Sequence, residues 1–123
     1  MMAPSRPVLQ ARKWLPMASF QARTSREPGR TVIRLAGECD LAVRERLTGT
    51  LLAAVDAAPV VVVDLAAVEF LDSTGIHALV AAHHRARAAD GRLYLVNAAG
   101  SVAALLELTG VGELLRHPGE ATD

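Results

Sequence analysis

The sequence predicts an α/β fold with a mixed sheet, and three observations lead to this prediction. Residues 60–63 are four consecutive valines, which suit a central strand buried on both faces. Residues 41–57 and 74–89 flank this strand and carry apolar residues at three- and four-residue steps, which predicts two helices. Residues 92–96 form a further apolar strand, and strands joined through helices of this length pair in parallel through right-handed crossovers.

The sheet is expected to begin with an antiparallel hairpin, which makes it mixed. Residues 18–22 and 31–35 form the two strands, and residues 27–29, Glu-Pro-Gly, lie between them as a turn sequence. Asp40 then has the side chain of a helix cap, and Pro59 ends the first helix.

The central strand is expected to span residues 60–64. A short turn then leads to a polar cluster, Asp72-Ser73-Thr74, at the start of the second helix. That helix stops at an Asp-Gly pair in which Gly91 is available for a left-handed cap. This strand–turn–helix arrangement places hydroxyl side chains in an exposed position that favours anions.

The last part of the chain predicts a third helix and a short final element. Ser101 is expected to cap the helix, which runs to Leu108 and is ended by Gly110. Residues 113–115 are expected to form the final element, before a polar tail.

The length of 123 residues fits one domain, and 51% hydrophobic residues are enough to build a core without metals or disulfides. We expect this domain at residues 18–116, followed by a polar tail at residues 117–123. Residues 1–17 contain three prolines and no sustained period, and are expected to be a disordered basic extension. An alternative is that residues 1–16 lie upstream of the true start, with Met17 as the first residue.

Charge is distributed unevenly along the chain. Residues 1–30 hold six basic residues and one acidic residue, a balance of +5, whereas residues 31–123 hold seven basic and twelve acidic residues, a balance of −5. Because no five basic residues are contiguous, direct DNA binding is not expected. No apolar run approaches the roughly 20 residues of a membrane-spanning helix, so we expect no membrane span and a cytoplasmic protein. Trp14 is expected to be an exposed aromatic residue, with a membrane or partner anchor as the alternative.

Three histidines, one cysteine and one serine are candidates for metal binding or nucleophilic chemistry, and each also has an ordinary structural explanation. His77, His83 and His84 lack the i,i+4 spacing of a helical metal site, so no metal and no cofactor is expected, and His83 is expected to be partly buried. Cys39 is the only cysteine and has no CxxC companion, which favours a small buried hydrophobe over a reactive thiol. Ser73 lies in no GxSxG motif, which argues against a hydrolase.

Three motifs carry a resemblance to a known family. The run from Val60 to Gly75, ending in Asp-Ser-Thr-Gly, resembles the phosphorylation-site region of STAS domains, the fold of bacterial anti-sigma factor antagonists. Residues 35–40, Leu-Ala-Gly-Glu-Cys-Asp, are similar to the family's motif before the first helix, and residues 105–111 are similar to its motif near the end. The resemblance covers roughly residues 18 to 116. It implies a single STAS-like domain with a four- to five-stranded mixed sheet and helices packed chiefly on one face.

The resemblance also implies a site. The first hydroxyl residue after the aspartate, which is phosphorylated in the family, corresponds to Ser73. Thr74 matches a second hydroxyl that is usually unmodified, and we expect it to cap the helix, with phosphorylation of Thr74 as the alternative. Asp40, Asp72 and Gly75 match positions near the phosphorylation site and are candidates for partner binding together with Ser73 and Thr74, with helix capping or close backbone approach as the alternative roles.

The resemblance finally implies a non-enzymatic regulator. Such a protein binds an anti-sigma factor with serine kinase activity while unphosphorylated, releases it when phosphorylated, and is reset by a serine phosphatase. In this way it controls the availability of a sigma factor. The alternative is a soluble STAS accessory subunit of a transporter or of a stress-signalling assembly.

Overall fold

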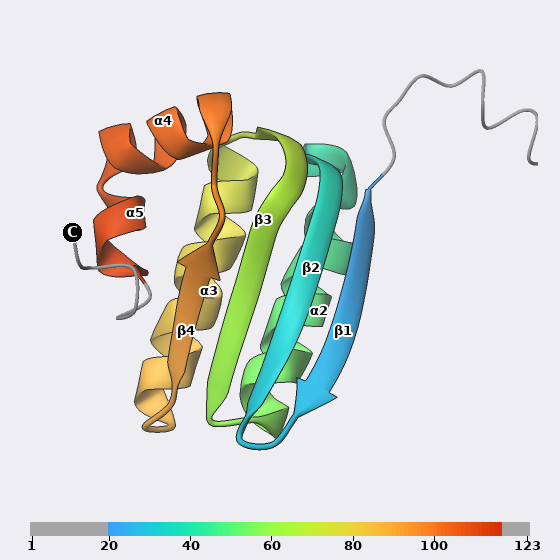
Figure 1. The fold of residues 1–123 in the computed structure, drawn as a ribbon, viewed down its shortest axis with the longest axis vertical. Helices are drawn as coiled ribbons and strands as arrows, with labels where there is room; N and C mark the ends of the chain where they lie inside the picture. Colours follow the sequence, from blue (N-terminus) through green and yellow to red (C-terminus); the bar gives the residue numbers. More distant parts are fainter. Residues whose placement is uncertain (1–19, 117–123) are drawn as a thin grey trace, which may run out of the picture.

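The computed structural model describes residues 20–116, which form one four-stranded sheet of order β1-β2-β3-β4 (Figure 1). β1 runs antiparallel to β2, whereas β2, β3 and β4 are mutually parallel. The predicted α/β fold with a mixed sheet is therefore confirmed. The strands are β1 (Gln21–Glu27), β2 (Arg30–Cys39), β3 (Val60–Leu71) and β4 (Arg92–Val96).

Helices cover one face of this sheet, as expected. Figure 1 shows the two long helices packed side by side on that face, with two short helices beside β4. Their bounds are α2 (Arg44–Ala57), α3 (Ser73–Ala88), α4 (Gly100–Thr109) and α5 (Val111–Leu114). The core lies between the sheet and the helices, and its fully buried large side chains include Ile33, Leu35, Leu47, Leu51, Val61, Val63, Leu65, Leu79 and Leu93.

Three strands, β1, β2 and β3, are longer than the sequence predicted, and β1 is also shifted. β1 begins at Gln21 and continues to Glu27, because the tight turn that follows pairs Glu27 with Arg30 directly. Gly29 allows this turn with its positive φ of 79°. The predicted strand at residues 18–22 was therefore wrong in its extent, and residues 18 and 19 lie outside the described residues.

The expected end of β3 at residue 64 was also wrong. β3 continues to Leu71, and β2 continues with it to Cys39 beyond the expected end at residue 35. The pairing of β2 with β3 shifts register between Arg34 and Ala36 and again between Gly37 and Glu38. Near the first shift, the Ala66 amide donates to the Asp64 carboxylate at 2.9 Å. A bulge thus replaces the predicted turn, and the paired strands deliver their ends to the start of the two helices.

The helix ends differ in three places. Residues 41–57 form a 3-10 turn, η1 (Leu41–Val43), followed by α2, rather than one helix. Ser101 does not cap α4, because that helix begins at Gly100 and the residue before it makes no side-chain cap. At the end of α3 the left-handed residue is Asp90, with φ 64°, instead of the expected Gly91. Gly91 instead allows close approach, since a Cβ there would lie 2.7 Å from the Pro59 carbonyl oxygen.

Candidate phosphorylation and partner-binding site

The ends of β2 and β3 bring two of the predicted site residues together. Cys39 and Leu71 are paired as the last residues of the two strands, and Asp40 and Asp72 follow them directly. The Asp72 amide donates to the Cys39 carbonyl oxygen at 3.4 Å, which holds the second strand end against the first. The two carboxylates therefore share one edge of the sheet.

Asp72 is the side chain that caps α3. Its carboxylate accepts hydrogen bonds from the backbone amides of Thr74 at 2.9 Å and Gly75 at 3.2 Å. The prediction that Thr74 caps this helix was wrong, because the extended backbone of Asp72 places its carboxylate over those free amides. Asp40 plays the same part for η1, accepting from the Ala42 amide at 3.1 Å.

Ser73 is the first residue of α3 and is exposed. Among the described residues none forms a hydrogen bond with its side chain, so neither a histidine nor a carboxylate activates the hydroxyl. His77, one turn further along α3, is exposed as well. Among the described residues, the Ser73 hydroxyl therefore has no neighbouring general base hydrogen-bonded to it.

Gly75 is buried beneath Ser73 and Thr74. A Cβ at this position would lie 2.9 Å from the Cys39 carbonyl oxygen and would also meet the Leu71 side chain. Only glycine allows the first turn of α3 to lie so close to the end of β2. Gly75 therefore sets the distance between the first turn of α3, which carries Ser73, and the end of β2.

Cys39 is completely buried at the base of the site. Burial, together with the nearby carboxylates of Asp40 and Asp72, raises the pKa of its thiol to about 11. The thiol is neutral at physiological pH, so the interpretation of Cys39 as a small buried hydrophobe is confirmed.

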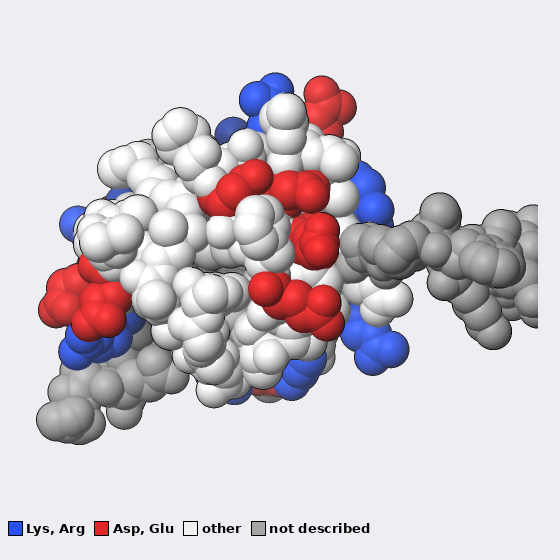
Figure 2. Space-filling model, turned by 90° about the horizontal axis from the view of Figure 1, so that it is seen from above, with Lys and Arg blue, Asp and Glu red and all other residues white. Residues whose placement is uncertain are grey.

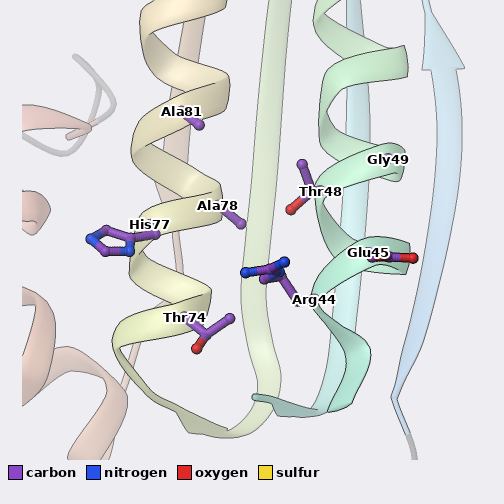
Figure 3. A pocket seen from close by; sticks show the side chains of 8 residues that line it. All are labelled: Arg44, Glu45, Thr48, Gly49, Thr74, His77, Ala78 and Ala81. Carbon is purple, nitrogen blue, oxygen red and sulfur yellow. The ribbon is translucent and has the colours of Figure 1, made fainter. Parts of the chain in front are cut away.

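A groove of about 570 Å³ separates the N-terminal halves of α2 and α3 (Figure 3). In Figure 3 the Arg44 side chain extends from α2 toward α3, and Thr74 forms the opposite wall. Small residues keep the groove open, namely Gly49 on α2 and Ala78 and Ala81 on α3. The sequence interpretation missed this groove, although small residues recurring on one face of each helix are the signal that points to it.

An acidic surface with exposed apolar side chains lies around the strand ends. Seen from above, acidic side chains gather beside uncharged ones there (Figure 2). Phe70 is 45% exposed and pairs across the strands with Glu38, and Leu41 is 67% exposed. We call this region the acidic-apolar surface, and it consists of Glu38, Asp40, Leu41, Glu69, Phe70 and Asp72. The sequence interpretation placed only its two aspartates at the site, because it ended both strands too early.

The histidines do not form a metal site in the described part of the chain, where no three potential ligands cluster. His83 is buried, more completely than the partial burial that the sequence predicted, and its Nδ1 has no hydrogen-bond partner among the described residues. Burial lowers its pKa, and the nearby charges of His84, Arg87 and Arg92 lower it further. In residues 20–116 no helix is both long enough and apolar enough to span a bilayer.

Comparison with known proteins agrees with this geometry, because the STAS domain family matches residues 21–122. The chain belongs to the STAS domain family. It is similar to the structure of an anti-sigma factor antagonist from Mycobacterium paratuberculosis, at 29% identity and a TM-score of 0.72 over 81% of this chain and 86% of that one. No curated protein sequence matched the chain.

Two further solved structures show how far the similarity in fold extends. The anti-sigma factor antagonist SpoIIAA in its unphosphorylated form is 25% identical, with a TM-score of 0.67 over 77% of this chain and 84% of that one. A sulfate transporter family protein from Wolinella succinogenes is 23% identical, with a TM-score of 0.62 over 74% of this chain and 75% of that one. At that identity the transporter protein shares the fold alone.

Proposed function

We propose that this STAS domain protein is an anti-sigma factor antagonist controlled by phosphorylation of Ser73. Unphosphorylated, it binds an anti-sigma factor that has serine kinase activity, and this binding frees a sigma factor. Phosphorylation of Ser73 by that kinase releases the anti-sigma factor, and a serine phosphatase reverses the modification. The observation that carries the proposal is the exposed, unactivated hydroxyl of Ser73 at the first position of α3.

The charge of a phosphate explains why such a switch works without unfolding the domain. Phosphorylation adds a charge of about −1.5 to −2. At a helix N-terminus the dipole and the free amides favour an anion by roughly 0.3 to 1 kcal/mol, so the domain tolerates it. Against a partner the same charge is desolvated beside Asp40 and Asp72, at a cost of several kcal/mol. Since about 1.4 kcal/mol is tenfold in affinity, we expect a loss on the order of a hundredfold or more.

Phosphopeptide mapping tests the modification. After incubation with the cognate kinase and ATP, Ser73 should be the residue modified to high occupancy. Ser101 is a matched control, since it is an exposed serine in the first turn of another helix, α4. Ser73→Ala should abolish incorporation and Ser101→Ala should leave it unchanged. Modification chiefly on Thr74 or Ser101 would contradict the assignment.

Co-purification and affinity measurements test the switch. Ser73→Ala should retain an anti-sigma factor constitutively, and Ser73→Asp should lose part of the affinity. The melting temperature and the partner affinity of the phosphorylated and unmodified protein should be measured side by side. If phosphorylation lowers both together, the switch acts by unfolding the domain and the electrostatic explanation is wrong.

A second candidate function comes from the transporter protein that shares this fold. In this alternative the chain is an accessory subunit of a transporter or of a stress-signalling assembly. Neighbouring permease genes would support the alternative, whereas a neighbouring gene for a small kinase-like ATPase would support the phosphorylation switch. The exposed serine at position 73 favours the switch.

A further inference from the structure

The carboxylates of the acidic-apolar surface have no ion-pair partner among the described residues. The described residues form four ion pairs, and none of them includes an acidic residue of this surface. Asp40 and Asp72 accept hydrogen bonds only from backbone amides. Leu41 and Phe70 remain exposed among these carboxylates. A complementary ligand must therefore bring basic groups together with large apolar ones.

The chain itself contains a segment of this chemistry. Residues 1–19 include three basic residues and no acidic residue. Residues 12–15 read Arg-Lys-Trp-Leu, so two cations are followed directly by two large apolar side chains. Aromatic side chains are well suited to such contacts because they bury much apolar area at a low cost in conformational entropy.

The described chain begins at the end of the sheet that carries this surface. β1 is antiparallel to β2 and Gln21 pairs with Ala36, so the chain before Gln21 approaches from the end of β2 that carries Glu38. Phe70 pairs with Glu38 one strand further along the sheet. With strands about 4.8 Å apart and about 3.4 Å per residue, Gln21 and Phe70 are about 12 Å apart.

The length of the connection matches this distance. Six residues lead from Trp14 to Phe20, and a flexible chain of that length has a root-mean-square span of about 13 Å. Phe20 is itself buried, with the Arg46 guanidinium 5.0 Å from its ring centroid, so the tether has a fixed origin. A connection of six residues is therefore long enough to span the distance to Phe70.

We propose that residues 12–15 bind the acidic-apolar surface of the same chain. Trp14 contacts Phe70 and Leu41, while Arg12 and Lys13 face the surrounding carboxylates. A short flexible tether gives an effective concentration in the millimolar range, so even a contact of millimolar intrinsic affinity occupies the surface about half of the time. The segment is then more than the plain basic extension expected from its composition.

This docking has a regulatory consequence, which rests on the proposed function. The surface includes Asp40 and Asp72 and adjoins Ser73, so a docked segment competes with the anti-sigma factor for the same residues. Removal of residues 1–16 should therefore increase the affinity of the unphosphorylated protein for its partner. The occupancy of the segment sets the size of the increase, which is about twofold at half occupancy.

The test uses Trp14 as a probe, because it is the only tryptophan in the chain. Its emission maximum and its quenching by acrylamide are compared between the full chain and a free peptide of residues 1–19. In the full chain we expect emission at shorter wavelength and weaker quenching than in the peptide. About 1 M NaCl, which shortens the Debye length to about 3 Å, should move both values toward those of the peptide.

Variants of the surface identify the docking site. Phe70→Ala, and separately the double variant Asp40→Asn/Glu69→Gln, should shift emission and quenching to the values of the peptide. Leu108→Ala is the matched control, because Leu108 is 83% exposed on α4, outside the surface, and its removal should leave Trp14 protected. Circular dichroism verifies that each variant is folded, and the two surface variants test the proposal independently of each other.

Three results would overturn the proposal. The first is wild-type emission and quenching equal to those of the free peptide, and the second is protection of Trp14 that survives in both surface variants. The third is protection that grows with protein concentration, because the segment would then bind a second copy. None of these readouts needs a partner protein, whereas failure of the proposed function would appear as absence of Ser73 phosphorylation and of anti-sigma factor binding.

Discussion

At the end of the sheet that carries Ser73, Asp40 and Asp72 accept hydrogen bonds only from backbone amides, whereas at the opposite end Asp56 and Glu27 are paired with arginines. Asp56 on α2 accepts two hydrogen bonds from Arg85 on α3, at 2.9 and 2.8 Å. Glu27 and Arg30 pair across the β1–β2 turn at 2.8 Å. The described residues thus pair these two acidic side chains with arginines at one end, and present carboxylates without an ion-pair partner at the other. Unpaired charges are the ones that a binding partner can contact, which supports the proposal that the Ser73 end binds the partner.

At both ends, nevertheless, a glycine allows a helix or the turn after it to lie close to a backbone carbonyl oxygen. Gly75 lies against the Cys39 carbonyl at the Ser73 end, and Gly91 lies against the Pro59 carbonyl at the other. The Arg92 amide also donates to the Pro59 carbonyl at 2.9 Å. The two ends therefore differ in their side chains and not in how tightly the backbone is packed.

The largest expected change in stability tests the close packing of Gly75 against the Cys39 carbonyl at the Ser73 end. Gly75→Ala places a methyl group 2.9 Å from the Cys39 carbonyl oxygen, so α3 must shift away from the strand end. We expect the free energy of unfolding to fall by about 1 to 3 kcal/mol. Each kcal/mol corresponds to roughly 4 to 8 °C in melting temperature for a domain of this size, which thermal denaturation measures.

Gly49→Ala is the matched control for this prediction. Gly49 is also in a helix, but a Cβ there has no neighbouring atom within 4 Å. Alanine should therefore stabilise α2 by about 0.5 to 1 kcal/mol through its higher helix propensity. Equal melting temperatures for Gly75→Ala and the wild type would show that the Ser73 end is loosely packed, contrary to the comparison above.

The sequence was sufficient for the features that depend on local chemistry. The four valines of residues 60–63 predicted the central buried strand, and the position of Ser73 after an aspartate predicted an exposed hydroxyl at a helix start. The isolated Cys39 predicted a buried thiol. Each of these follows from residue type and nearest neighbours along the chain.

Features that depend on strand pairing were not predictable in the same way. The bulge at Asp64 has no distinctive local sequence, because it arises from how β2 and β3 stay in register as they bend. Because the sequence predicted that β3 ends at residue 64, Glu69 and Phe70 fell outside the predicted strand. The prediction therefore did not place them beside Glu38. The acidic-apolar surface was therefore missed, although each of its residues is visible in the sequence.

A smaller expected effect separates the two roles of Asp72. Asp72→Ala removes the acceptor for the Thr74 and Gly75 amides and should lower the free energy of unfolding by about 1 kcal/mol. Asp72→Asn keeps a capping oxygen without the charge, and its stability should stay within a few tenths of a kcal/mol of the wild type. Chemical denaturation of both variants measures this difference.

Partner affinity then sharpens the comparison between the ends. If the charge of Asp72 serves recognition, Asp72→Asn should weaken binding of the anti-sigma factor even though its stability is retained. Asp56→Asn at the opposite end should leave that affinity unchanged. Equal losses for the two asparagine variants would mean that net charge, and not the acidic-apolar surface, determines binding.

The smallest expected effect lies at the buried histidine and appears only in acid. His83 is buried with an unpartnered Nδ1, and burial lowers the pKa of its imidazole from the ordinary value of 6.5, with His84, Arg87 and Arg92 adding to the effect. The unfolded chain therefore binds more protons at this site than the folded one below pH 6.5. Stability from this group is present above pH 6.5 and is lost as the pH falls toward the lowered pKa.

His83→Leu should accordingly lose less stability than the wild type between pH 7 and pH 5, as measured by chemical denaturation at each pH. His77→Leu is the matched control, because His77 lies on the same helix but is exposed near Ser73, and this variant should retain the wild-type pH dependence. If His83→Leu also retains it, His83 is not the pH-sensitive group, and its burial does not cost the folded domain stability in acid.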